Sequence, residues 1–91
     1  MRVRKVDANQ PAMVRELRAA GYSVAHIHTV GKGCPDLLVG KRNRTMVVEV
    51  KNGPKDKLTD DEIEWRDRWT GSYVVAWQAE QVMQAFEHGE R

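Results

Sequence analysis

The chain has 91 residues, which is enough for one small domain with a limited hydrophobic core. Hydrophobic residues make up 41% and charged residues 31%, a balance that is typical of a globular protein and excludes a disordered tract. The net charge of +2 selects no class of partner, no apolar run is long enough to span a membrane, and the single cysteine, Cys34, excludes an internal disulfide. We therefore expect a cytoplasmic protein.

The first half of the chain predicts one helix and three strands. The helix begins near Asn9, a good N-cap, and ends at Gly21. Strands follow at 22–28, 36–39 and 46–51, and a polar turn at 41–44 joins the last two. The segment 46–51 gives the strongest strand signal because it contains three valines. The apolar face of the helix is formed by residues at helical spacing, namely Met13, Val14, Leu17 and Ala20.

The second half predicts a helix, a strand and a final helix. Thr59 and Glu62 match a capping box that opens the first of these helices. A strand at 73–77 and a helix at 79–86 complete the order α-β-β-β-α-β-α, which favours an α/β fold with a central mixed sheet flanked by helices. The inward-facing residues of the two helices are expected to be Ile63, Trp65, Trp69, Val82, Met83 and Phe86.

Three residues on the second and third strands can carry chemistry. Side chains alternate along a strand, so Glu49 and Lys51 point to the same face, and the short turn at 41–44 brings Asp36 near Glu49. Two carboxylates can hold Mg²⁺ or Mn²⁺, with the backbone carbonyl of Val50 as a further ligand. Lys51 can orient a water and offset the charge of a phosphate. We therefore predict a metal-dependent endonuclease with Asp36, Glu49 and Lys51 as catalytic residues.

Pro35-Asp36 followed by Glu49-Val50-Lys51 resembles the signature of the PD-(D/E)xK nuclease superfamily. The glycine-rich segment 31–40 and the segment 58–65 are similar to a stand-alone VRR-NUC domain of the phage or bacterial type, over roughly residues 7–86. The resemblance implies a single domain over 1–91, with a restriction-endonuclease-like αβββαβ core at about 7–87 and an added C-terminal helix. It also implies a homodimer that cuts branched DNA such as four-way (Holliday) junctions, with Asp36 and Glu49 as metal ligands and Lys51 as the catalytic lysine.

The chain departs from this family pattern in two places. Where relatives carry an acidic residue on the first helix, this chain has Gln10, with Glu16 further along. Gln10 can act as a neutral substitute or hold a metal-bound water. Where relatives often carry a glutamine early in the second helix, this chain has Glu62, and its capping role already explains it. These three residues form a second tier of site candidates.

The middle of the chain is basic. Residues 31–57 carry seven Lys and Arg against three Asp and Glu. A basic segment next to a nuclease site favours contacts with DNA phosphates. The candidates for these contacts are Lys32, Lys41, Arg42, Arg44, Lys55 and Lys57.

Three other functions fit the same residues. A module of this fold could bind branched DNA and cut it poorly, because Gln10 replaces the acidic residue of the first helix. A restriction-like enzyme would cut linear duplex, although no recognition domain is visible in 91 residues. A metal-free interaction domain would have no measurable affinity for Mn²⁺.

Overall fold

The computed structural model describes residues 8–88, so Asp7 and the outer ends of the predicted domain lie outside the described residues. The predicted order of helices and strands is confirmed, with a short 3-10 helix, η1, added after the first strand. The elements are α1 (Gln10–Ala19), β1 (Ser23–His26), η1 (His28–Val30), β2 (Leu37–Lys41), β3 (Arg44–Val50), α2 (Asp60–Arg68), β4 (Tyr73–Ala76) and α3 (Ala79–Glu87).

The four strands form one mixed sheet in the order β1-β2-β3-β4. The pairs β1–β2 and β2–β3 are antiparallel, whereas β4 runs parallel to β3. The predicted turn between β2 and β3 is a tight hairpin, in which Arg42 and Asn43 have φ angles of 53° and 66°. Two such residues suit the turns that match the twist of paired strands. The hairpin fixes the register in which β2 lies beside β3.

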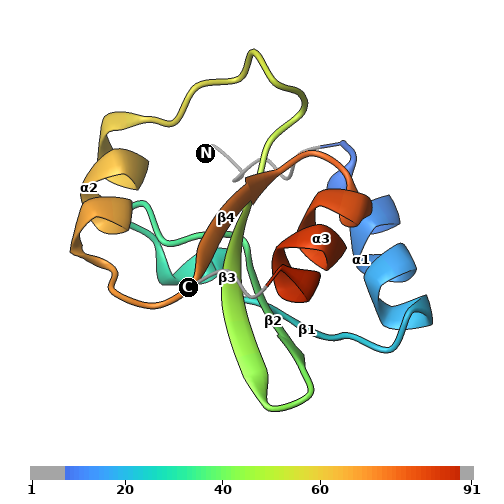
Figure 1. The fold of residues 1–91 in the computed structure, drawn as a ribbon. Coiled ribbons are helices and arrows are strands. Elements are labelled where there is room, and N and C mark those ends of the chain that lie inside the picture. The colour runs from blue at the N-terminus through green and yellow to red at the C-terminus, as the bar shows by residue number, and fades with distance from the viewer. Residues whose placement is uncertain (1–7, 89–91) are drawn as a thin grey trace.

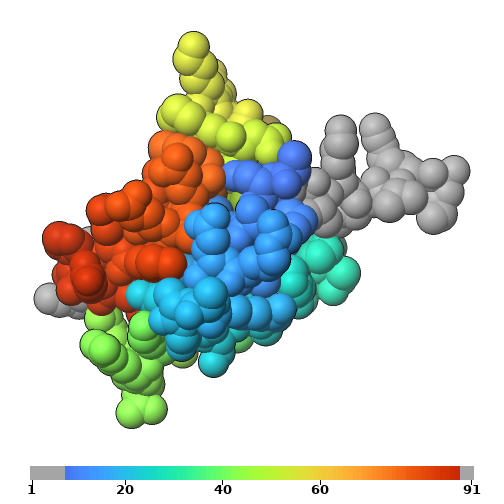
Figure 2. All heavy atoms as spheres, turned by 90° about the vertical axis from the view of Figure 1, so that its right-hand side faces the viewer, coloured from blue at the N-terminus to red at the C-terminus, as the bar shows by residue number. Residues whose placement is uncertain are grey.

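Helices cover both faces of the sheet. Helices α1 and α3 lie on one face and α2 lies on the other (Figure 1). Along β3, Met46, Val48 and Val50 join Leu17 of α1 and Val82 of α3 in the buried core. Figure 2 shows α1 and α3 side by side, with the loop after β3 and the β2–β3 hairpin protruding at opposite ends of the molecule. The alternate residues of β3 therefore face α2.

Aromatic side chains pack at α2 and join it to β4. Trp65 stacks on Trp69 with ring centroids 4.9 Å apart, and Trp65 lies 6.3 Å from the ring of Tyr73 on β4. The predicted apolar side of α2 is only partly covered, since Ile63 is 36% and Trp69 42% exposed. No helix among residues 8–88 has the length and apolar character needed to cross a membrane.

The structure corrects three local predictions. The first strand ends at His26 and not at residue 28, because Val30 N–H donates to Ile27 O at 3.1 Å and starts η1. Ala20 is exposed, since it is the C-cap of α1 and lies beyond the helix face that packs on the core. Asn9 precedes α1 as predicted, but its side chain does not cap the helix. Its amide instead donates to the carbonyls of Lys51 and Trp77, both at 2.8 Å.

Candidate active site

Asp36 is attached to β3 by both its backbone and its side chain. Its N–H donates to Val48 O at 3.1 Å, and its Oδ2 accepts a hydrogen bond from Val50 N–H at 2.8 Å. The carboxylate thus continues the pairing of β2 and β3 one step beyond Leu37, where the β2–β3 ladder begins. Because the backbone N–H and the carboxylate of Asp36 both bond to the central strand β3, the carboxylate is held in one place.

Glu49 lies on the face of β3 that is turned toward α2, and Lys51 follows directly after the strand. Glu49 is 4% exposed, and its Oε2 lies 3.8 Å from Lys51 Nζ. Besides burial, the carboxyl group of Asp36 is close enough to Glu49 to raise its pKa. The structure therefore brings together the three residues that the sequence predicted as a catalytic set.

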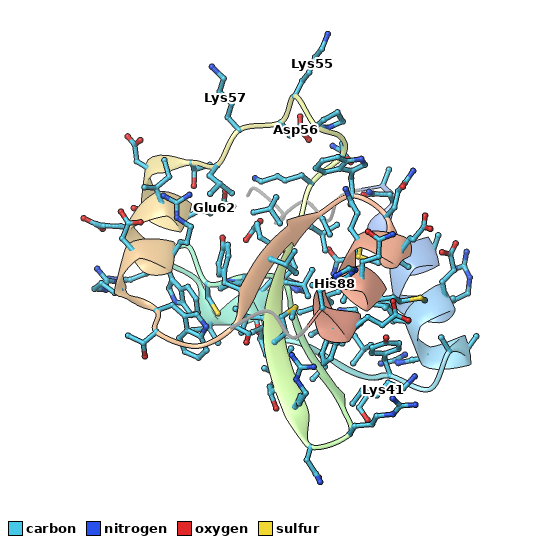
Figure 3. All side chains as sticks on the ribbon, viewed as in Figure 1. Lys41, Lys55, Asp56, Lys57, Glu62 and His88 are labelled. Carbon is cyan, nitrogen blue, oxygen red and sulfur yellow. The ribbon has the colours of Figure 1, made fainter. Side chains whose placement is uncertain are left out.

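Glu62 reaches the same place from the first turn of α2. Its Oε1 accepts hydrogen bonds from Lys51 Nζ and from Thr59 N–H, both at 2.9 Å. The capping box is complete, because Thr59 Oγ1 accepts from Glu62 N–H at 3.2 Å. Glu62 therefore caps the helix and also contacts the lysine of the site. Asp36, Glu49, Lys51 and Glu62 are called the carboxylate cluster below (Glu62 is labelled in Figure 3).

Gly33 allows α2 to come this close. Gly33 has a φ of +84°, and a Cβ at this position would collide with the backbone carbonyl of Asp61 and lie 2.9 Å from Glu62 N. Only a residue without a side chain fits such a backbone-to-backbone approach. The glycine-rich segment before Asp36 thus sets the position of the first turn of α2, and with it Glu62.

The carboxylate cluster holds three carboxyl groups and one ammonium group. Burial of Glu49, followed by the nearby charges of Asp36 and Glu62, raises the pKa of Glu49 to about 9. Burial alone would also raise the pKa of Glu62, but hydrogen bonds from Lys51 and Thr59 outweigh it and lower that pKa. The excess of negative charge is a reason for this site to attract a cation.

The donors available at this site are oxygen atoms, which suit hard divalent cations such as Mg²⁺ and Mn²⁺. Among residues 8–88, no three His, Cys, Asp or Glu side chains are already arranged as a metal-binding group. A cation with few protein ligands keeps several waters, as Mg²⁺ commonly does. Asp36 and Glu49 are the carboxylates that could hold such an ion, and Lys51 contacts both Glu49 and Glu62.

Tyr73 is a neighbour of the cluster that the sequence reading did not single out. It pairs with Val47 on the adjacent strand, so its side chain lies on the same face as Glu49. Its hydroxyl is buried and has no hydrogen-bond partner among the described residues. Burial and the charges of Glu49 and Glu62 raise the pKa of Tyr73, so the hydroxyl remains a proton donor. The sequence signal that could have identified Tyr73 is the alternation of side chains along the strand predicted at 73–77.

Two second-tier candidates make no hydrogen bond with the cluster within the described part of the chain. Gln10 is 2% exposed, and its Nε2 lies 3.4 Å from His26 Nδ1. Glu16 is exposed on α1 and lines a groove with Trp77 and Glu80. Within residues 8–88, neither side chain hydrogen-bonds to the carboxylate cluster, so Glu62 is the member of this tier that the structure brings to it.

The predicted DNA-contact residues divide between the two ends of the molecule. Lys55 and Lys57 are exposed on the loop that follows β3, and Figure 3 shows them pointing away from the body on the same side as Glu62. Lys32 is exposed in the loop that leads to Asp36. The remaining three, Lys41, Arg42 and Arg44, lie at the hairpin, at the opposite end of β3 from Glu49.

The hairpin cations contact backbone carbonyls. Lys41 Nζ donates to Ala20 O at 2.8 Å and lies 4.2 Å from the centre of the Tyr22 ring. Arg44 donates to Phe86 O. Five residues of an extended strand span about 17 Å, so this group is remote from Glu49. The structure does not bring these three basic residues to the carboxylate cluster.

Comparisons of this chain with family models, with curated proteins and with solved structures found no match. The resemblance to VRR-NUC domains therefore stays a prediction from the motifs.

Proposed function

We propose that this protein is a divalent-metal-dependent endonuclease that hydrolyses phosphodiester bonds in branched DNA, such as four-way junctions. The observation that carries the proposal is the fixed placement of Asp36, whose Oδ2 accepts from Val50 N–H at 2.8 Å, beside the buried Glu49 and Lys51. The motif resemblance to PD-(D/E)xK nucleases of the VRR-NUC type supports the same reaction. A restriction-endonuclease-like core is part of this proposal.

Asp36 and Glu49 would hold Mg²⁺ or Mn²⁺, and the carbonyl of Val50 lies on the strand edge that faces Asp36, because Val50 N–H already points there. When bound, such an ion neutralises phosphate charge and lowers the pKa of a water. Lys51 holds a proton at Nζ and orients an attacking water or a phosphate oxygen. Glu62 is a positioning residue, since it fixes Lys51 Nζ at 2.9 Å.

The decisive experiment compares cutting of a labelled four-way junction with cutting of its linear duplex arm, in Mg²⁺ or Mn²⁺. We expect the junction to be cut and the duplex to be spared. Lys51→Ala should slow cutting by at least about 10²-fold, because a positioned proton-transfer group contributes that much. Arg68→Ala, an exposed change on α2, is the matched control and should cut like wild type.

Lys51→Ala leaves Glu49 and Glu62 without their ammonium partner, so its fold must be checked by circular dichroism. Asp36→Asn is the second variant, since an amide oxygen can still accept from Val50 N–H. Equal cutting by wild type and by both folded variants would contradict the proposed site.

A second candidate is a branched-DNA-binding module that cuts poorly. It is favoured by Gln10, a neutral residue that makes no hydrogen bond with the cluster among residues 8–88. Tight binding of the junction by wild type, with no cutting in either metal, would select this candidate. Cutting of the linear duplex instead would select a nuclease that acts on duplex DNA.

The proposed enzyme is a cytoplasmic homodimer. A four-way junction has two symmetric scissile phosphates, and a two-fold dimer presents two matching sites. The partly exposed Ile63 and Trp69 of α2 offer an apolar surface for the contact. Light scattering at micromolar concentration should give the mass of a dimer, and Trp69→Lys should give a folded monomer. A wild-type protein that is strictly monomeric would contradict the proposed homodimer.

A further inference from the structure

Arg66 lies on α2 one turn beyond Glu62. Residues four apart on a helix share one face, so the two side chains leave α2 on the same side. Glu62 Oε1 contacts Lys51 Nζ at 2.9 Å, so this side of the helix is the one that reaches the carboxylate cluster. A cation outside the basic segment 31–57 therefore lies next to the cluster.

The hydroxyl of Tyr73 connects Arg66 with the carboxylates. Burial and then the charges of Glu49 and Glu62 raise the pKa of this hydroxyl, and the positive charge of Arg66 opposes the rise. Interactions between charges weaken with distance, so one group that responds to all of these charges lies close to each of them. Arg66 is thus a neighbour of the carboxylate cluster in space as well as along the helix.

The present contact of Arg66 uses only part of its side chain. Its Nε and Nη2 both donate to the same oxygen, Asp67 Oδ1, at 3.2 and 3.1 Å. The side chains are 44% and 63% exposed, and exposed ion pairs of this kind contribute little to stability. A guanidinium has five N–H donors, so donor capacity is left for a second acceptor. Arg66 is therefore accessible to a ligand without loss of a structural contact.

A phosphodiester group suits this position. Its oxygens can accept two parallel N–H bonds from a guanidinium, a geometry that lysine cannot offer. The negative cluster repels a phosphate, so a nearby cation helps to hold the strand. The four residues from Glu62 to Arg66 rise about 6 Å along the helix. Successive nucleotides of a B-DNA strand rise about 3.4 Å, so a strand lying along α2 would bring the next phosphate, or the one after it, to Arg66.

We propose that Arg66 binds a phosphate of the DNA strand that is cut at the carboxylate cluster, one or two nucleotides from the scissile bond. This inference rests on the proposed nuclease function and adds a contact that sets the direction of the strand along α2. The contact needs no metal, because the cation is supplied by the protein.

The test measures binding of a labelled four-way junction in EDTA by fluorescence anisotropy, so no cutting is required. Arg66→Gln should weaken binding by about tenfold, as the loss of a charge-assisted hydrogen bond does. The slope of log affinity against log salt should fall by about 1. Arg66→Lys should restore this slope but only part of the affinity, because lysine keeps the charge and lacks the fork.

Arg68→Gln is the matched control, because it removes the same charge from the same helix. Arg68 lies 4.0 Å from Glu64 on the other side of α2, since residues two apart on a helix point in nearly opposite directions. Both substitutions are exposed and introduce a good helix former, so both variants should fold. Arg68→Gln should bind like wild type. Equal weakening by the two variants, or wild-type binding by Arg66→Gln, would overturn the proposal.

A second measurement locates the phosphate. Single methylphosphonate substitutions make one phosphate at a time neutral along each strand of the junction. Wild type and Arg68→Gln should lose about tenfold in affinity at one shared position, where Arg66→Gln should lose nothing further. The absence of any position with this non-additive effect would contradict the contact.

These binding results are separate from the cutting assay, since they involve neither the metal nor Lys51. Binding that depends on Arg66, with no junction cutting in Mg²⁺ or Mn²⁺, would retain the phosphate contact and contradict the endonuclease. Junction cutting together with binding that does not depend on Arg66 would do the reverse.

Discussion

The two ends of β3 differ in the sign of their charge and in how that charge is paired. At the hairpin end, Lys41 and Arg44 are paired with the carbonyls of Ala20 and Phe86, near the C-terminal ends of α1 and α3. Cations are stabilising at the C-terminal ends of helices, so these residues fulfil a local structural need. At the other end, Lys51 is the one ammonium group beside three carboxyl groups.

This difference shows that charge alone does not locate a functional site. The basic residues are dense at the hairpin, yet their contacts are explained by the fold itself. The carboxylate cluster keeps a negative excess that the fold does not compensate, at the cost of an unusually high pKa for Glu49. Substitutions at the compensated end and at the uncompensated end should therefore have different effects.

The largest effect is expected from Gly33→Ala, which forces the first turn of α2 away from the cluster. Gly31→Ala is the matched control, because Gly31 has a similar φ of +83° but nothing within 4 Å of an added Cβ. Gly33→Ala should destabilise the protein by about 1–3 kcal/mol more than the control, as overpacking does. Displacement of Glu62 from Lys51 should also slow junction cutting by about tenfold to 10²-fold.

Urea unfolding and the junction assay measure both consequences of Gly33→Ala. If the two glycine variants lose equal stability and cut equally well, the close approach of α2 is unimportant. The positive φ alone would then explain the glycines.

Glu49→Gln should change how the stability of the metal-free protein depends on pH. The pKa of Glu49 is about 9 in the fold against 4.5 for an unperturbed group, so unfolding releases a proton between these values. Wild-type stability should therefore fall as pH rises from 4.5 to 9, and Glu49→Gln should remove this fall. Thermal melts at pH 5, 7 and 9 should separate the two proteins by at least about 5 °C at the highest pH.

Addition of Mn²⁺ should reverse the wild-type trend, because a cation that needs the ionised carboxylate binds better as pH rises. Glu49→Gln should lose most of this stabilisation. Removal of the metal with EDTA should restore the original melting curve. An equal Mn²⁺ effect in both proteins would show that the ion binds elsewhere.

The smallest effect concerns the basic residues at the two ends. Lys55→Gln combined with Lys57→Gln should lower the slope of log affinity for DNA against log salt by about 2, if each lysine contacts one phosphate. Lys41→Gln should instead lower stability by about 1 kcal/mol and leave the slope unchanged, because it loses a helix-end contact. A slope change at Lys41 would place DNA at the hairpin as well.

Much of the fold follows from local sequence patterns. The alternation of valines with Glu49 and Lys51 places both charged residues on one face, and the tight turn at Arg42 and Asn43 fixes the register with Asp36. The capping box likewise sets the start of α2 at Thr59. These features depend on residues that are close together in the chain, so local patterns in one sequence are enough to predict them.

The remaining parts of the site depend on distant contacts. No local pattern indicates that Gly33 packs against Asp61, or that Asn9 donates to carbonyls 42 and 68 residues away. Asn9 was therefore predicted to be an ordinary N-cap, and Glu62 was ranked only as a second-tier site candidate because its capping role already explained it. The hairpin cations were assigned to DNA because their helix-end partners lie in other elements.

The bridge made by Asn9 has a consequence for synthesis of the chain. Its amide joins the start of α1 to the ends of β3 and β4, and β4 must insert parallel to β3 before the bridge can close. A chain still emerging from the ribosome therefore holds Asp36, Glu49 and Lys51 without this support until Trp77 has left the ribosome. Contacts between residues so far apart in the chain slow folding, because a long loop must close before they form.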